Sequence, residues 1–522
     1  MNTHLPFISL VLIGLVLYSC QPKTQESKVE SHLGEIHFKV TGAAEAQPYF
    51  EKGLLLLHSF EYEDARAEFL KAQELDPDFA MAFWGEAMTH NQPIWQRQQY
   101  DEGKAALEKL AATPEGRQAK AGAELERDLL KAVEVLFGEG DKFGRDKAYA
   151  SNMEGLYEKY PGNHEVAAFY ALSLLGSVAV GRDEAVFEKG AAIAEGILKE
   201  NPNHPGALHY LIHSYDDPGH ASLAKTAADR YAGVAPDAAH ALHMPSHIFV
   251  AMGMWDEVVA SNEASYAASV KRMERMGLDN DARSYHALHW LLYGYLQQGR
   301  VADARRILDD MVQYTETLPS KSARSYLVRM KGNYLVETDE YAGSYADIEV
   351  NLEELNISQQ AIWQFLEGMK AYQQKDKKQL AGIIDAMGQA RQQAGMAVTN
   401  AGTPMCGAGG SYGNPNQLDI DQAYILELEL QGLLASLSGN EAQAEKLFQQ
   451  AVQLEDGASY SYGPPEVVKP SYELYAEWLM EQNRYEDAMT MFDRALKRGP
   501  KRLRALNGQL QASRALSSIR LD

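Results

Sequence analysis

The sequence predicts an all-α fold, an α-solenoid of antiparallel helix pairs with loop insertions. Apolar residues recur at helical spacing along almost the whole chain, and no strand-rich segment or alternation of strands and helices interrupts them. Ala, Leu, Glu and Gln dominate, and only 19 of the 522 residues are proline. With 45% hydrophobic and 23% charged residues, most of the chain is expected to fold rather than remain disordered.

The N-terminus predicts export and a lipid anchor. Residues 5–17 are an apolar run that is too short to span a bilayer comfortably. The sequence Leu17-Tyr18-Ser19-Cys20 follows, and it resembles the bacterial lipobox, in which a cysteine is lipidated and becomes the new N-terminus. The alternatives are an ordinary cleaved signal peptide or an anchor helix, and the first four residues lack the usual Lys or Arg.

Lipidation of Cys20 implies a protein outside the cytoplasm, tethered to a membrane by its lipid alone. Gln21 resembles the signal for sorting to the outer rather than the inner membrane in enterobacterial-type systems. Cys406 would then be the only free thiol, so no intramolecular disulfide is expected.

Three segments repeat a pattern of small, aromatic and proline residues. Residues 46–79 and 469–502 both place alanine, phenylalanine, alanine and proline at successive spacings of four, three and five residues. These residues are Ala65, Phe69, Ala72 and Pro77 in the first segment and Ala488, Phe492, Ala495 and Pro500 in the second. Residues 425–458 carry the same pattern, but with Asp456 in place of the proline.

This pattern resembles the tetratricopeptide repeat, a pair of antiparallel helices in about 34 residues. Small residues are expected where the two helices cross closely, and proline is expected to stop the second helix. The segment from Ala207 to Trp255, with its histidine-rich motifs, also resembles poorly characterised bacterial tetratricopeptide-repeat lipoproteins. That resemblance supports one long module and implies no particular reaction.

The resulting division of the chain has five parts and two insertions. The parts are a signal peptide (1–19), a polar tether (20–36), N-terminal helices (37–160), a central histidine-rich segment (161–315) and C-terminal helices (316–522). The insertions are glycine-rich loops at 400–416 and 456–470. Long loops in a helical array favour a lid or a packing insert over one face.

Histidines are concentrated in the central segment. Nine of the 15 lie between residues 204 and 289, and none follows residue 289. Pro202 and Pro236 set helix pairs at 205–238 and 239–272, and a further pair is expected to begin near residue 285. Pro245 is expected to kink or delay the helix in which it lies.

The resemblance implies which of these residues face the concave groove of the solenoid. In the tetratricopeptide family, positions 2, 5, 9, 12 and 13 of the first helix line that groove. The corresponding residues here are His209, His213, Asp216, Asp217, His240, His243, His247, His286 and His289. Imidazoles three or four residues apart share one face of a helix and can chelate a divalent transition metal.

We therefore expect a metal site formed by these nine residues, for zinc, iron, copper, nickel or manganese. A hydrogen-bonded polar core, a pH-sensitive groove and a metal-free ligand surface are the alternatives. The favoured function is an extracytoplasmic, membrane-anchored binding scaffold with this metal site in its groove. The second is a metal-dependent hydrolase or oxygenase in which Asp216 or Asp217 is the candidate base, and the third is a plain protein-interaction scaffold.

Charge limits the class of partner. Asp and Glu total 72 against 49 Lys and Arg, for a formal net charge of −23. A nucleic-acid-binding protein is not expected, because neutralising phosphates requires a basic surface. The expected partners are a protein or peptide, or a small molecule bound at the metal.

Overall fold

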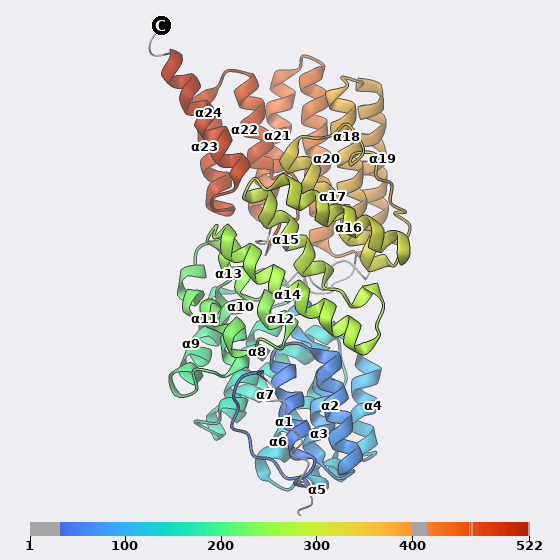
Figure 1. Cartoon of the computed structure of the whole chain (residues 1–522), viewed down its shortest axis with the longest axis vertical. Coiled ribbons are helices and arrows are strands. Elements are labelled where there is room, and N and C mark those ends of the chain that lie inside the picture. Colours follow the sequence, from blue (N-terminus) through green and yellow to red (C-terminus); the bar gives the residue numbers. More distant parts are fainter. Residues whose placement is uncertain (1–31, 399–414, 459, 461–462, 520–522) are drawn as a thin grey trace, which may run out of the picture. The chain divides into compact units, whose positions relative to one another are not determined.

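The computed structural model describes residues 32–398, 415–458, 460 and 463–519, and within them the chain is almost entirely helical (Figure 1). The regular strands in these ranges are β1 (Asn91–Gln92) and β2 (Arg97–Gln98), which form one short antiparallel pair. The predicted all-α class is confirmed. None of the helices described is both long enough and apolar enough to cross a bilayer. Cys20, Cys406 and most of the 400–416 loop lie outside the described residues.

Helices in the N-terminal part pack against their sequence neighbours. They are α1 (Gln47–His58), α2 (Tyr62–Leu75), α3 (Ala80–Thr89), η1 (Pro93–Trp95), α4 (Tyr100–Leu110), α5 (Pro114–Lys120), α6 (Glu124–Leu136) and α7 (Lys142–Lys159). Helices α1 and α2 occupy the repeat at 46–79, and the three residues between them force the chain to reverse direction.

The small residues of this first repeat allow close helix contacts. The ring of Phe69 on α2 lies against Gly53 on α1 and Gly85 on α3, where an added Cβ atom would overlap it. Ala65 and Ala72 on α2 are fully buried. The spacing of small and aromatic residues thus produces the packing that the repeat pattern predicts.

The central part contains the elements that carry the histidines. They are α8 (His164–Gly176), α9 (Glu184–Glu200), α10 (Pro205–Tyr215), α11 (Ala221–Val234), α12 (Ala239–His243), α13 (Pro245–Ala251), α14 (Trp255–Met276), η2 (Asn280–Ala282), α15 (Tyr285–Gln297) and α16 (Val301–Thr317). The expected break at Pro245 is present: the first helix of the 239–272 window is divided into α12 and α13 at Met244.

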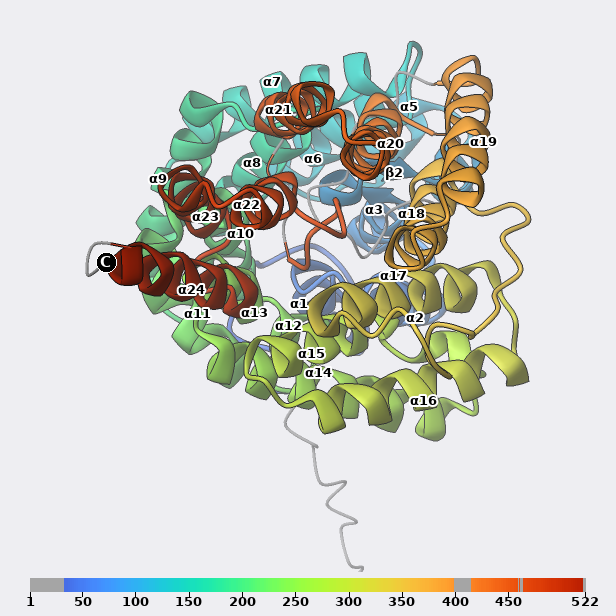
Figure 2. The same cartoon turned by 90° about the horizontal axis from the view of Figure 1, so that it is seen from above.

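The C-terminal part continues the series of helices. They are α17 (Lys321–Thr338), α18 (Ile357–Gln373), α19 (Lys377–Gly395), α20 (Gln417–Leu437), α21 (Glu441–Gly457), α22 (Ser471–Glu481), α23 (Tyr485–Arg498) and α24 (Leu503–Ile519). Figure 2 shows that helices α15 to α24 follow one another along a curved path. The connection between α21 and α22 lies on the inner side of this curve.

That connection, the second predicted loop, packs onto the central helices. Gly463 has a φ of +108° and lies so close to the indole of Trp290 on α15 that any Cβ atom there would overlap the ring. Glu466 forms an ion pair with Arg329 on α17 at 2.7 Å. Glycine at 463 therefore meets two requirements, a left-handed backbone and contact with a ring.

We predict that Gly85→Ala lowers the free energy of unfolding by about 1–3 kcal/mol, because the new methyl group must displace Phe69. Gly196→Ala on α9 is the matched control, since a Cβ atom there meets no neighbour within 4 Å. The control should be neutral or more stable by up to about 1 kcal/mol. Urea denaturation followed by circular dichroism measures both changes, and equal effects would contradict the packing described.

Candidate metal centre

Six of the seven histidines predicted to face the groove come together in one cluster. We call the set His209, His213, His240, His243, His247 and His286 the inner histidine cluster. Ring centroids of neighbouring members are 4.9 Å apart for His209 and His213, 5.5 Å for His213 and His247, and 4.5 Å for His243 and His286. Five of the six residues are buried and His240 is half-buried.

The cluster consists of two groups of three, in each of which one ligand atom per residue lies within 4.8 Å of the others. The first triad is His209, His213 and His240, from α10 and α12. The second triad is His243, His247 and His286, from α12, α13 and α15. The break at Pro245 separates His243 from His247, yet their rings remain 5.1 Å apart.

In the first triad, every Nε2 atom is buried and has no hydrogen-bond partner among the described residues. The Nδ1 atom of His209 donates to the backbone carbonyl of His58 at 2.7 Å, so the proton of the neutral ring is on Nδ1. Its Nε2 atom therefore carries a lone pair that no described neighbour uses. Buried polar atoms are rarely left in this state, and a metal ion is one explanation for such an exception.

In the second triad, as in the first, a hydrogen bond at the Nδ1 atom of one ring places the lone pair of that ring on Nε2. The Nδ1 atom of His243 donates to the side-chain oxygen of Asn262 at 2.7 Å, and the Asn262 amide donates to the Val258 carbonyl at 2.8 Å. The Nε2 atom of His243 is thus a lone-pair acceptor, and it faces the Nε2 atom of His286 at 3.0 Å. A proton on His286 completes that contact when no metal is bound.

Asp216 links the two triads. Its Oδ2 atom lies 3.1 Å from Nδ1 of His247 and 3.4 Å from Nδ1 of His213, so one carboxylate orients a ring of each triad. A carboxylate behind a metal-binding imidazole fixes the ring and makes it more basic. Burial raises the pKa of Asp216 to about 6, and its Oδ1 atom has no hydrogen-bond partner among the described residues.

Two of the predicted ligands neither belong to a triad nor link the two triads as Asp216 does. Asp217 is ion-paired with His220 at 2.8 Å and lies 3.1 Å from Arg182, so it is turned away from Asp216's partners. His289 places Nε2 2.6 Å from the side-chain oxygen of Asn333 and belongs to no candidate metal group in the described residues. Repeat positions alone could not show these local pairings.

Burial keeps the inner histidine cluster uncharged at neutral pH. It lowers the pKa of His243 and of His247 to about 3, and that of His209 well below its ordinary value. Neighbouring imidazoles add to the shift, because a second positive charge nearby would be unfavourable. Neutral rings have a lone pair available for a metal without first losing a proton.

In a third candidate metal-binding group, formed by His58, Glu165 and His204, every ring nitrogen has a hydrogen-bond partner. His58 and His204 place Nε2 2.7 Å and 3.2 Å from the two oxygens of Glu165. The remaining nitrogens are also occupied, by the Tyr210 hydroxyl at 2.8 Å and the Ala207 amide at 3.1 Å. Burial alone would raise the pKa of Glu165, but the two histidines hold it well below its usual range. This group joins α1, α8 and α10 and leaves no lone pair unused.

The inner histidine cluster lies in a closed interior, which differs from the expected open groove. Phe60 stacks over the first triad, with its ring 4.2 Å from that of His209, and Trp95 lies against His240 at 5.7 Å. Trp290 covers the second triad, 4.7 Å from the ring of His247, and Gly463 of the inserted loop packs on that indole. Aromatic side chains and the loop therefore exclude water from the face that the repeat register predicted to be exposed.

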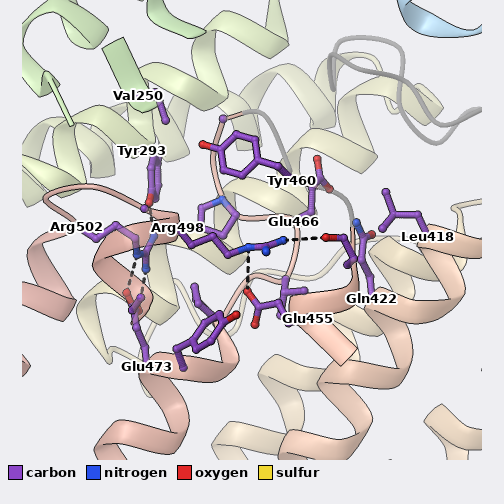
Figure 3. Close-up of a pocket in the computed structure, with 18 of the residues that line it drawn as sticks. Val250, Tyr293, Leu418, Gln422, Glu455, Tyr460, Glu466, Glu473, Arg498 and Arg502 are labelled. Atoms are coloured by element: carbon purple, nitrogen blue, oxygen red, sulfur yellow. Dashed lines mark hydrogen bonds and ion pairs between the residues drawn. The ribbon is translucent and has the colours of Figure 1, made fainter. Parts of the chain in front are cut away.

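A pocket adjoins this interior on the side of the inserted loop (Figure 3). It is lined by Val250, one turn after His247 on α13, and by Tyr460, which is close enough to Asp216 to be affected by its charge. Two ion pairs form part of its wall: Arg502 with Glu473 at 2.6 Å and Arg498 with Glu455 at 3.8 Å. Gly463 also lines the pocket, so the pocket and the second triad are connected through the Trp290 ring on which Gly463 packs.

Several residues of the centre escaped the sequence analysis. Asn262 lies on α14, the second helix of the 239–272 pair, whereas Phe60 and Trp95 lie in the N-terminal part. Nothing in their local sequence marks them as neighbours of the histidines. The His58 carbonyl that anchors His209 is a backbone group, for which no residue-type signal exists. Each contact joins residues at least 19 positions apart in the chain, so only the folded chain reveals it.

The fold and the site together define a repeat-built, all-α protein with a buried histidine cluster. Residues 46–79 match the family model described as tetratricopeptide repeat. The match confirms the tetratricopeptide repeat that the sequence predicted at residues 46–79, and helices α1 and α2 form it. No curated protein sequence matches the chain.

Several solved structures match the chain over most of its length, with little shared sequence and low TM-scores. Cut9–Hcn1 from the APC/C hetero-tetramer is 12% identical over 92% of this chain and 78% of that chain, with a TM-score of 0.36. Yeast Tom70 is 12% identical over 91% of this chain and 96% of that chain, with a TM-score of 0.34. The human IFIT1 dimer with m7Gppp-AAAA is 12% identical over 92% of this chain and 96% of that chain, with a TM-score of 0.35. Similarity at this level carries no functional information.

We predict that the buried His289 makes the metal-free protein sensitive to acid. Burial lowers its pKa to about 4 from an ordinary value of 6.5, so between these two values the unfolded chain binds a proton that the folded chain excludes. The free energy of unfolding should therefore fall as pH decreases, with His289 contributing about 2 kcal/mol between pH 7 and pH 5.

The measurement is urea denaturation of chelator-treated protein at both pH values. His289→Gln is the comparison, because glutamine can still donate to Asn333 but does not titrate in this range. The variant should lose less stability on acidification than the wild type. Identical losses would show that His289 does not contribute in this way.

Proposed function

We propose that this tetratricopeptide-repeat protein binds a transition metal through the inner histidine cluster. The observation that carries the proposal is the first triad, in which each residue places one ring nitrogen within 4.8 Å of the others and all three Nε2 atoms are buried without a hydrogen-bond partner among the described residues. Leaving three such atoms unpaired would cost roughly 1–3 kcal/mol each, and a bound metal ion removes that cost. The contrast with the fully paired His58–Glu165–His204 group supports the assignment.

The donor set narrows the choice of ion. Each triad offers only imidazole nitrogens, which suit copper, zinc, nickel and iron better than the oxygen-preferring manganese. Asp216 lies behind two of the rings and orients them. Three protein ligands also leave a position for a further ligand, as in zinc sites that activate water.

We further propose that the protein works outside the cytoplasm as a membrane-anchored binding scaffold. The lipobox-like sequence ending at Cys20 supports this location, and the apolar run before it supports export. The partner would be a protein or peptide held by the repeat surface, or a small molecule at the metal. The acidic net charge of −23 supports a partner other than nucleic acid.

A second candidate function is a metal-dependent enzyme, and the closure of the site favours it. A scaffold that presents a metal would need an open face, whereas catalysis benefits from a water-excluding interior beside a pocket. The pocket in Figure 3 is lined by Tyr460, which is affected by the charge of Asp216, and by Gly463, which packs on the Trp290 ring over the second triad. Asp216 is the candidate base, because its pKa of about 6 allows it to accept a proton near neutral pH. Hydrolase and oxygenase screening of the metal-loaded protein tests this candidate.

We predict that His213→Ala combined with His247→Ala abolishes tight metal binding. The double variant removes one ligand from each triad, and both residues that Asp216 orients, so affinity should fall by at least about 100-fold. The measurement is elemental analysis of protein from residue 27 onward, purified without a histidine tag or chelator, followed by titration with zinc and copper.

His220→Ala is the control, because His220 pairs with Asp217 outside both triads. Circular dichroism should show nearly wild-type helicity for all forms. Wild-type metal content in the double variant would disprove the site. A metal-induced rise in Tm for the wild type and the control, absent from the double variant, gives a second readout that does not depend on purification history.

A further inference from the structure

The two triads are separate and complete sets of ligands, and this bears on how many ions the centre holds. We propose that the inner histidine cluster binds two metal ions side by side, one in each triad, and that both are copper in its singly charged state. The inference rests on the proposed metal-binding function and adds the number, placement and identity of the ions.

Geometry favours two ions over one. Metal–imidazole bonds are about 2.0–2.1 Å long, so two nitrogens on one ion lie within about 4.2 Å of each other. The ligand atoms within each triad lie no more than 4.8 Å apart, so only small ring movements would bring them to this limit. The six residues do not form one such group together, because the candidate groups never combine more than three of them.

One alternative is a single ion held by His213, Asp216 and His247, which also form a candidate group. Such an ion would have to bind the Nδ1 atoms, since these are the nitrogens that face Asp216. It would leave the buried Nε2 atoms of the first triad without a partner. Two ions bound to the Nε2 atoms would give those atoms a partner. Asp216 would stay beside the Nδ1 atoms of His213 and His247, one ring of each triad.

The second triad can accept an ion without taking or releasing a net proton. The 3.0 Å contact between the Nε2 atoms of His243 and His286 contains one proton, which belongs to His286. Binding of a metal between them requires His286 to carry its proton on Nδ1 instead. That atom faces the Tyr326 hydroxyl at 3.4 Å, which can accept it.

Charge favours copper(I). All six ligands are neutral. The carboxylates that contact them are Asp216, beside two of the rings, and Glu61, which accepts from the backbone N–H of His240 at 2.9 Å. Two divalent ions would place four positive charges in an interior lined by Phe60, Trp95 and Trp290, whereas two univalent ions place only two there. Burying charge without compensation is costly, and among the ions that imidazole binds well, copper is the one with an accessible singly charged state.

The test is an anaerobic titration with copper(I) against a competing chelator, in protein from residue 27 onward. The wild type should bind two ions per chain. His240→Asn and His286→Asn each remove one ligand from a different triad and should each bind one ion tightly. His220→Asn, outside both triads, should bind two.

A second measurement uses the wild type alone and so does not depend on whether a variant folds. Copper-loaded protein is oxidised with two equivalents of ferricyanide, which takes one electron from each copper(I) to give two copper(II) ions. Two ions in adjacent triads should give a spin-coupled paramagnetic resonance spectrum, with less signal than two isolated ions. His286→Asn should give the spectrum of one isolated ion.

The outcomes separate this inference from the proposed function. If the wild type binds one ion per chain, and His240→Asn and His286→Asn do not change this number, the two-ion arrangement is wrong. The proposal that the protein binds a metal would still stand. Two uncoupled copper(II) signals would also overturn it. Zinc binding at two equivalents with affinity equal to that of copper(I) would overturn the choice of ion. Protein that binds neither metal would overturn both the pair and the proposed function.

Discussion

The centre depends on one constraint, that a neutral imidazole has a single proton and must place it on one of two nitrogens. The His58 carbonyl, the Asn262 amide oxygen and Asp216 each accept from an Nδ1 atom of the inner histidine cluster. Each of these contacts forces the lone pair onto Nε2. Because the Nε2 atoms converge, the hydrogen bonds around the rings determine where a metal can bind.

The repeat architecture explains how so many imidazoles share so small a volume. Side chains at equivalent positions of successive first helices meet: His209 on α10 lies 5.1 Å from His240 on α12, and His243 on α12 lies 4.5 Å from His286 on α15. One first helix is divided at Met244, before Pro245, yet the rings of His243 and His247 remain 5.1 Å apart across the division. Both residues therefore still belong to one triad.

The inner histidine cluster is covered by other side chains, so it differs from the open surface of a repeat solenoid. Tetratricopeptide solenoids present extended concave surfaces, but here the first repeat supplies Phe60 and the inserted loop supplies Gly463 to cover the histidines. A dry, aromatic interior strengthens every electrostatic interaction inside it and makes unpaired polar atoms costly. The unpaired nitrogens are therefore more informative in this location than they would be on an open surface.

The sequence by itself determined the helical class, the tetratricopeptide repeat at 46–79 and the set of histidines that gather at the centre. These depend on local spacing: small residues at helix crossings, prolines between repeats, and imidazoles at three- and four-residue intervals. The tertiary structure alone decided that Asp216 rather than Asp217 contacts the rings, that His289 pairs with Asn333, and that the site is closed. Those outcomes depend on contacts between residues far apart in the chain, and the periodicity of a single helix carries no information about its distant neighbours.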